Sequence, residues 1–208
     1  MHEARGMNET PLLRALFREL FQTEMSGRTH PRKEAKRLAP SPPADAMSAI
    51  ADDCEATLPR VVALAEERGY PVSALGLAIG RMLSAMRTAS TDLVATRELS
   101  YRGTLIGLRH AVDVVTLLRA TAARAGDAAV LRFCDDWLAR RRPMIDALER
   151  ALGWFAAHPD AAMHPAEDGF LAQQADRGRR ALAALDDGID RVRRTLSTST
   201  SASRPLRG

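Results

Sequence analysis

Few residues of this chain have the type and spacing that metal binding or catalysis needs. A histidine lies three residues before a carboxylate at two places, His110 with Asp113 and His164 with Glu167, and no glutamate stands three residues before any histidine. Helical bundles that hold two metal ions use a Glu-x-x-His pair on each of two helices. The sequence therefore predicts no metal centre and no cofactor. Because His110 is turned about 200° around a helix from Leu108, we expect His110 and Asp113 to face outwards, towards solvent or a partner.

The two cysteines, Cys54 and Cys134, both fall on apolar helical rows. This placement predicts buried free thiols, with a disulfide or redox pair as the alternative. No histidine lies near Cys134 in the sequence, and apolar surroundings raise a thiol pKa rather than lower it. With no Ser-His-Asp or Cys-His arrangement, we expect a protein that is not an enzyme.

Arg141 stands in the gap of an apolar row between Trp137 and Met144, two residues before Pro143. One interpretation is a side chain that buries its stem and carries its charge to the surface. The other is a contact with an anion or with a partner's carboxylate. Pro143 removes a helical hydrogen bond and clashes with the carbonyl of Ala139, so we predict a kink there.

A basic run precedes a proline-rich stretch in the N-terminal quarter. Its candidate contact residues are Arg32, Lys33, Lys36 and Arg37. We interpret residues 26–43 as a solvated linker, because prolines interrupt helices and like charges stay in water. The alternative is contact with a polyanion or an acidic partner. The run holds no aromatic residue for base stacking, so no specific nucleic acid is predicted.

The elements that must position these residues follow from apolar spacing. Apolar side chains recur by steps of four and three, which predicts amphipathic helices. Two such rows are Tyr101, Leu105, Leu108, Val112 and Val115, and Val130, Cys134 and Trp137. Hydrophobic residues make up 46% of the chain and aromatic residues only 4%. The sequence thus predicts an all-α fold.

We expect an antiparallel four-helix bundle over residues 44–157, with helices at 44–69, 71–98, 99–125 and 127–157. Before it we place an amphipathic docking helix within residues 1–25. After it we place a heptad helix at 166–196 and a disordered tail at 197–208. Gly126 and Asp127 end one helix and cap the next. The pairs Gly76/Gly80 and Gly103/Gly107 predict close approach between helices.

The stretch from Ser100 to Ala156 resembles the last two core helices of small ferritin-like bacterial proteins. The resemblance extends over about residues 44–157 and is one of pattern. It implies a four-helix architecture that in this family surrounds a di-iron centre. The Glu-x-x-His ligand motif is absent, so the family's oxidase or iron-storage activity does not carry over.

Charge and hydropathy bound the class of protein. The net charge is +4, from 30 basic and 26 acidic residues. The longest uncharged stretch, 69–80, is shorter than the roughly 20 residues that span a bilayer, and the N-terminus lacks the apolar core of a signal peptide. We therefore expect a cytoplasmic protein.

The functional expectation is a non-catalytic interaction or structural protein that forms homo-oligomers or binds a protein partner. The candidate self-association seam is Leu171, Leu182, Leu185, Ile189, Val192 and Leu196. Whether that helix packs on its own bundle or on a second chain stays open. The alternatives are a ferritin-like metal-binding oxidase or iron-handling protein, and an amphipathic surface coat of a membrane or granule.

Overall fold

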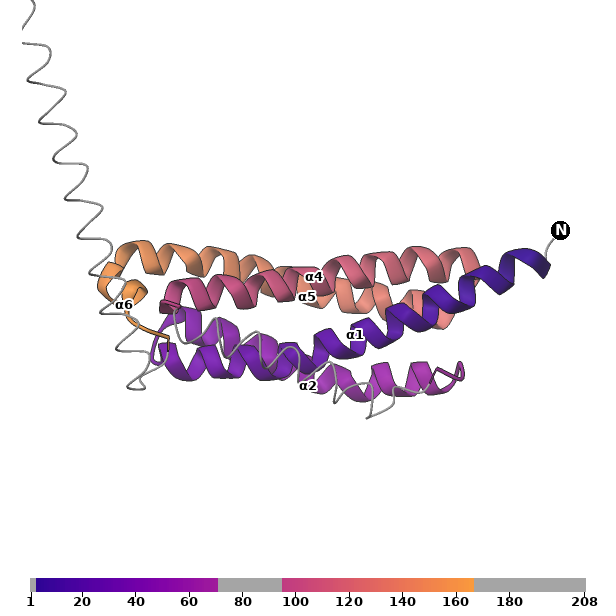
Figure 1. Ribbon diagram of the computed structural model, residues 1–208, viewed down its shortest axis with the longest axis horizontal. Coiled ribbons are helices and arrows are strands. Elements are labelled where there is room, and N and C mark those ends of the chain that lie inside the picture. The colour runs from indigo at the N-terminus through magenta and orange to yellow at the C-terminus, as the bar shows by residue number, and fades with distance from the viewer. Residues whose placement is uncertain (1–2, 71–94, 167–208) are drawn as a thin grey trace, which may run out of the picture.

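The computed structural model describes residues 3–70 and 95–166, and every long element in this part of the chain is a helix (Figure 1). In chain order its helices are α1 (Glu3–Leu38), α2 (Pro42–Glu66), α4 (Arg97–Ala125), α5 (Ala128–Ala157) and α6 (Pro159–Met163). The all-α prediction is confirmed. Most of the helix expected at 71–98, the heptad helix expected at 166–196 and the tail at 197–208 lie outside the described residues.

The predicted linker at residues 26–43 is wrong, because α1 continues as one helix to Leu38. Its buried side is occupied by Leu20, Glu24, Gly27, Pro31 and Glu34 in turn, with helical spacing. Because four of these five are not aliphatic, the apolar row is hidden in the sequence. Within residues 26–43 the chain leaves helical geometry only at residues 39–41. The docking helix predicted within residues 1–25 is the first part of α1 and belongs to the bundle.

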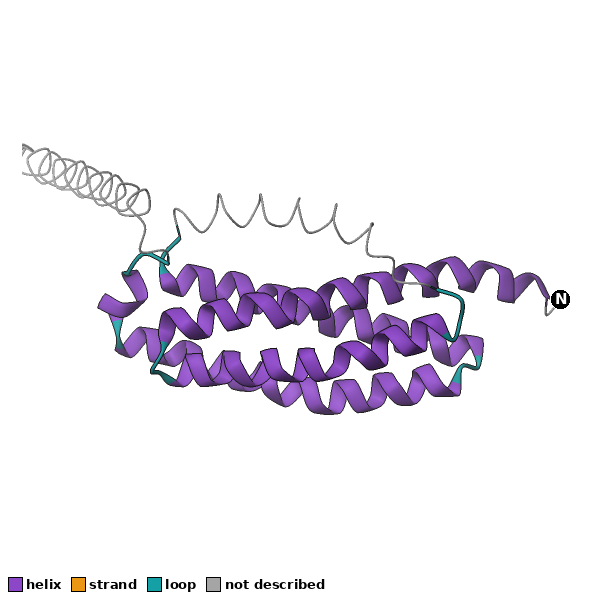
Figure 2. Ribbon diagram, turned by 90° about the horizontal axis from the view of Figure 1, so that it is seen from below, coloured by secondary structure: helices purple, strands orange, loops and turns teal. Residues whose placement is uncertain are grey.

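The four long helices pack around a shared interior, and each packs on two neighbours. α1 packs on α2 and α4, and α5 packs on α2 and α4. The C-terminal end of α2 lies beside the α4–α5 turn, where Arg68 bonds Asp127. The N-terminal end of α4 lies beside the C-terminal end of α1, where Arg37 bonds Ser100. Neighbouring helices are therefore antiparallel, whereas α2 and α4 point the same way (Figure 1). Figure 2 shows the long helices lying side by side along the bundle.

The predicted rows on α4 and α5 do face inwards. Tyr101, Leu105, Val115 and Trp137 are at most 1% exposed. The Tyr101 hydroxyl donates to the carbonyl of Leu148 at 3.0 Å, which joins the two helices. The turn between them is also as predicted. Gly126 has a φ of 71°, and the Asp127 carboxylate accepts from the amide of Val130 at 3.1 Å, as an N-cap does.

Pro143 lies inside α5, which runs unbroken from Ala128 to Ala157, and the kink expected there stays a prediction. The expectation of close approach at Gly103 and Gly107 is wrong, because a Cβ built on either would meet nothing within 4 Å. Both face outwards on α4, while Gly76 and Gly80 lie outside the described residues.

Close approach occurs instead at Gly27 on α1. A Cβ added there would lie 2.6 Å from the Cys54 sulfur of α2, well inside van der Waals contact. Gly27 is buried, and its missing side chain leaves the space that the Cys54 side chain fills. The α1–α2 pair therefore depends on a glycine in the stretch that the sequence presented as a linker.

Candidate functional site

Arg141 projects into the middle of the bundle, where its side chain is 1% exposed. The predicted surface-reaching conformation is wrong, because α1 and α2 present carboxylates to the guanidinium inside the core. Glu24 of α1 is fully buried, and the Asp53 side chain of α2 is 13% exposed. The sequence also allowed a contact of Arg141 with an anion or with a partner's carboxylate. In the structure the carboxylates that contact Arg141 belong to the same chain.

Five residues form what we call the Arg141 cluster: Glu24, Asp53, Cys54, Trp137 and Arg141. Arg141 Nη2 donates to Glu24 Oε2 at 3.0 Å and to Asp53 Oδ2 at 2.8 Å. Arg141 Nε also donates to Asp53 Oδ2, at 3.1 Å, and Nη1 lies 3.0 Å from the Cys54 sulfur. Three helices therefore converge on one guanidinium.

Trp137 completes the surroundings of both charges. Its indole Nε1 donates to Glu24 Oε1 at 2.9 Å, so each carboxylate oxygen of Glu24 accepts a hydrogen bond. The Arg141 guanidinium lies over the Trp137 ring, 4.6 Å from the ring centre, within the range of a cation–π contact. Because both ions have partners, their burial avoids most of the cost of an uncompensated charge.

The cluster separates two apolar cores along the bundle. Trp137 and Leu138 pack in the core at one end, and Ile145 and Leu148 pack in the core at the other. Arg141 lies between these pairs on the same face of α5. The bundle is therefore apolar towards both ends and ionic at its middle.

Burial and charge act on the titratable groups in opposite directions. Burial raises the pKa of Glu24 above its usual value, against the lowering effects of Arg141 and Trp137. Burial also raises the pKa of the Cys54 thiol, and it raises the pKa of Cys134 to about 12. Both cysteines are buried and free, as predicted, and neither has the lowered pKa of a nucleophilic thiol.

The donor set of the cluster does not fit the metal centre of a ferritin-like bundle. Glu24 and Asp53 could offer oxygen ligands, but the Arg141 guanidinium already lies between them and supplies the positive charge. A bound cation would have to displace a buried arginine and leave that arginine without a partner. His110, which with Asp113 has the spacing of the Glu-x-x-His motif in reversed order, is on the outer side of α4.

His110 and Asp113 are both exposed, as predicted. His110 Nε2 lies 2.9 Å from Glu19 Oε1 of α1, so the imidazole contacts a carboxylate of its own chain. The structure does not bring either residue to the Arg141 cluster.

The basic run lies on the last turns of α1. Arg32 pairs with Asp52 at 3.1 Å and also with Glu55, and Arg37 pairs with Glu34 at 2.6 Å. Lys33 and Lys36 are exposed. Arg32 and Arg37 are thus paired with carboxylates of the bundle, and contact of the basic run with a polyanion stays a prediction.

A scan of protein-family models, a search of curated proteins and a search of solved structures each find no match to this chain. Within residues 3–70 and 95–166, no helix has both the length and the apolar character to cross a bilayer.

Sequence reasoning missed Glu24 and Asp53 as members of the site. Glu24 follows Leu20 by four residues and so belongs to the buried row of α1, which is the one signal that could have revealed it. Asp53 gives no comparable signal, because an acidic residue next to Asp52 and Glu55 reads as part of an exposed face. Both carboxylates are identified only by the position of Arg141.

Proposed function

We propose that this chain is a non-catalytic helical module that self-associates through its C-terminal seam, residues 171–196. The observation that carries the proposal is the closed core of the described bundle. The inner positions of α1, α2, α4 and α5 pack against one another in two apolar clusters. The core does not need a further seam to close it, so the seam at 171–196 is available to a second copy.

The spacing of the seam supports pairing between copies. The six seam residues, together with Ala175 and Gly178, keep a four-three spacing over residues 171–196, which is the pattern of helices that supercoil around each other. The described chain ends beside the start of α4, where the Ala166 amide donates to the carbonyl of Ala95 at 2.9 Å.

The Arg141 cluster supports a structural rather than catalytic role. Arg141 and Glu24 are paired with each other inside the bundle and are at most 1% exposed, whereas a reacting group must meet its substrate. The ferritin-like alternative has one observation in its favour, since α2 and α4 are parallel and require one long crossover, as in ferritin-like bundles. Stoichiometric iron or manganese in the purified protein would favour that alternative over ours.

The test compares oligomeric mass in the full chain and its variants by light scattering. Leu182→Asp and Leu185→Asp place a charge in the seam, and Ala184→Asp places the same charge on the opposite side of the predicted helix. We expect the two seam variants to lower the mass and the control to leave it unchanged. Equal masses in all three, or loss of helical structure in the seam variants, would overturn the proposal.

Deleting residues 167–208 tests the same idea independently. We expect a folded helical core with a lower oligomeric mass, because the core closes without those residues. A truncated chain that is unfolded would show that the seam belongs to the bundle.

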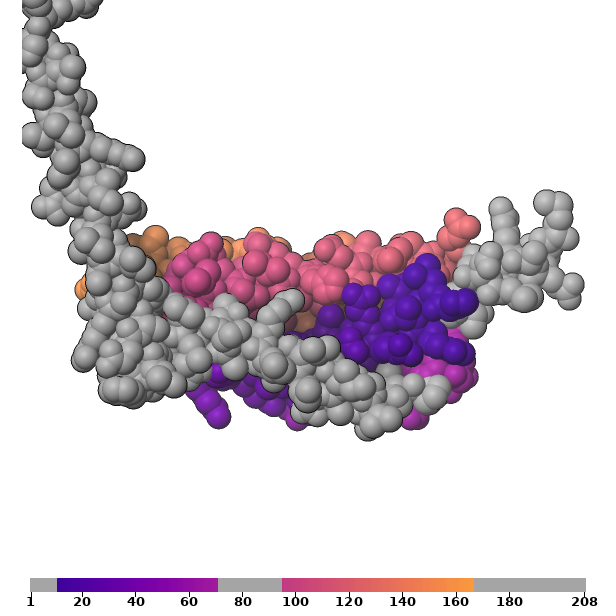
Figure 3. All heavy atoms as spheres, viewed as in Figure 1, coloured from indigo at the N-terminus to yellow at the C-terminus, as the bar shows by residue number. Residues whose placement is uncertain are grey.

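One observation favours a surface-coat function as the second candidate. α4 reaches the surface along the bundle (Figure 3), and its outer side carries Leu99, Ile106 and Leu117, which are 45%, 64% and 49% exposed. An outward apolar row of this kind suits the interface of a lipid surface. Binding to lipid vesicles that Ile106→Glu abolishes and Thr116→Glu leaves intact would favour this function.

A further inference from the structure

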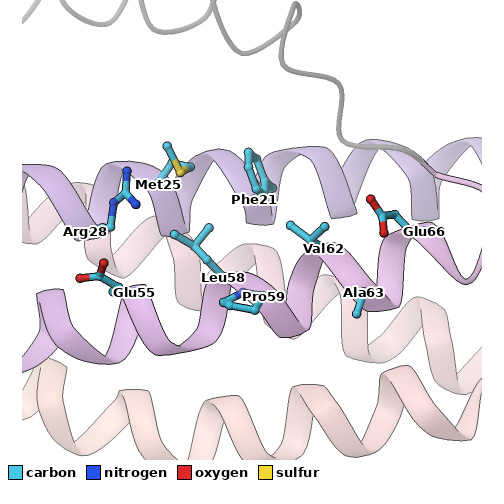
Figure 4. A pocket seen from close by; sticks show the side chains of 9 residues that line it. All are labelled: Phe21, Met25, Arg28, Glu55, Leu58, Pro59, Val62, Ala63 and Glu66. Carbon is cyan, nitrogen blue, oxygen red and sulfur yellow. The ribbon is translucent and has the colours of Figure 1, made fainter.

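An apolar groove of about 600 Å³ runs along the outside of the bundle between α1 and α2 (Figure 4). It is lined by Phe21, Met25, Leu58, Pro59, Val62 and Ala63. Arg28, Glu55 and Glu66 stand at its rim. Pro59 and Ala63 are exposed, and Phe21 and Val62 are only partly buried. Covering these apolar surfaces with another element would stabilise the folded protein.

We propose that residues 71–94 of the same chain dock in this groove as an additional helix, along the outside of α1 and α2. The groove is thus a packing site for the crossover between the two halves of the bundle. This inference is independent of the self-association proposed above, because it concerns another segment and another face.

The start of the segment is fixed on the α1 side of α2. Tyr70 packs against Phe17 of α1, with ring centres 6.0 Å apart, and the Arg14 guanidinium lies 5.5 Å from the Tyr70 ring centre. Gly69 has a φ of 67°, and the Tyr70 amide donates to the carbonyl of Ala65 at 2.8 Å, so the chain reverses within a few residues. A helix that follows so short a turn is an antiparallel neighbour of α2.

The end of the segment is fixed at the other end of α1. Ser100, near the start of α4, accepts a hydrogen bond from Arg37 at 2.9 Å. Residues 71–94 therefore connect one end of the bundle, at the level of Phe17, to the other end, at the level of Arg37. As a helix they would cover about 36 Å, and the stretch of α1 to be covered measures about 30 Å, at 1.5 Å per residue.

The sequence of the segment matches the groove. Leu75, Ile79, Met82, Met86 and Leu93 lie on one side of a helix. Since both helices rise equally per residue, an antiparallel arrangement about the turn at Arg68–Gly69 sets Leu75 opposite Val62 and Ile79 opposite Leu58. The same register brings Arg81 near Glu55 at the rim, where the opposite charges attract.

Engineered cysteines in the full chain test the position. Pro59→Cys with Ala78→Cys joins residues that this register sets opposite each other. Pro59→Cys with Ser84→Cys is the matched control, because Ser84 is on the other side of the predicted helix. We expect mild oxidation to give the disulfide within one chain for the first pair, at several times the yield of the control. Equal yields, or a disulfide that forms only between chains, would overturn the proposal.

A stability comparison gives a second readout that does not depend on disulfide geometry. Leu75→Asp and Ile79→Asp place a charge against the groove, whereas Leu77→Asp makes the same change on the other side of the segment. We expect the first two to lower the urea midpoint of unfolding and to increase binding of a dye specific for apolar surface, and Leu77→Asp to do neither. Equal effects of all three would refute docking through this side.

Discussion

Replacing Arg141 with methionine removes the charge at the middle of the bundle and keeps a side chain of similar length. The change leaves Glu24 fully buried, where the Trp137 indole still donates to it at 2.9 Å and the Cys54 thiol is also a hydrogen-bond partner. Asp53 is affected less, because its side chain is 13% exposed and Arg140 still lies 3.3 Å from its other oxygen. The loss of stability is therefore dominated by one carboxylate.

The expected cost follows from the protonation of Glu24. A carboxylate without a counter-ion in the core takes up a proton rather than remain charged. For a glutamate with an ordinary pKa near 4.5, this costs about 3.4 kcal/mol at pH 7, at about 1.4 kcal/mol per pH unit. Removing one partner of a buried ion pair costs roughly 3–5 kcal/mol in general, and the value for Glu24 falls within this range.

The assay is urea unfolding of the wild-type protein and Arg141→Met at several pH values. Without Arg141, the pKa of Glu24 rises further in the folded state, so the folded variant binds more protons than the unfolded chain between its two pKa values. Its stability relative to the wild type therefore increases as the pH falls. We expect a deficit of about 3 kcal/mol at pH 7 that shrinks by about 1 to 2 kcal/mol at pH 5.5.

Two results would refute this reasoning. One is a deficit below about 1 kcal/mol at pH 7, the level of an exposed ion pair. The other is a deficit of the expected size that does not change with pH. The control is Glu24→Gln combined with Arg141→Met, in which no carboxylate is left to protonate and the pH dependence of the deficit should disappear.

Three further predictions concern single sites. Gly27→Ala should lower the free energy of unfolding by about 1–3 kcal/mol, because the added methyl group overpacks against Cys54. Gly103→Ala, in open space on a helix, should raise the free energy of unfolding by about 0.5–1 kcal/mol. Urea unfolding measures both variants, and equal effects would contradict the close contact at Gly27. Asp127→Ala should cost about 1 kcal/mol at pH 7 through the lost cap. Because Arg68 lowers the pKa of Asp127, this contribution is present above the carboxylate's usual pKa and is lost as the pH falls through the lowered value, so the variant and the wild type should converge in acid. Cys54 and Cys134 should react with a thiol reagent only as fast as the protein opens, and rapid labelling of the native protein at neutral pH would show that they are accessible.

The sequence predicted α4 and α5 well because their buried positions are filled by ordinary apolar residues. Tyr101, Leu105 and Trp137 mark the inner face, and Gly126 with Asp127 gives the only turn chemistry needed between the two helices. An apolar row of this kind can be recognised from the sequence of one helix alone, without knowing which residues pack against it.

The second half of α1 could not be predicted in the same way. Glu24, Gly27, Pro31 and Glu34 are poor core residues when each is considered alone. Two of them fit the core through a distant partner, since Glu24 meets Arg141 of α5 and Gly27 meets Cys54 of α2. Pairing between residues so far apart along the chain cannot be deduced from the spacing of apolar residues, so the sequence predicts a linker there instead of a helix.

The position of Arg141 was recognised as unusual from the sequence, but its environment was not. A basic residue in an apolar row is compatible with a stem that reaches the surface and with an ion pair inside. The tertiary structure, which brings Glu24 and Asp53 to the guanidinium, shows that the ion pair inside is the correct interpretation.

The distance along the chain between Glu24 and Arg141, 117 residues, also has a kinetic consequence. α1 with α2, and α4 with α5, can each zip up as a hairpin after a short turn, whereas the ion pair forms only when the two hairpins meet. Contacts of that separation come late in folding. Stopped-flow measurements on Arg141→Met should accordingly find refolding almost as fast as in the wild type and unfolding much faster, so the arginine governs how long the assembled bundle survives rather than how quickly it assembles.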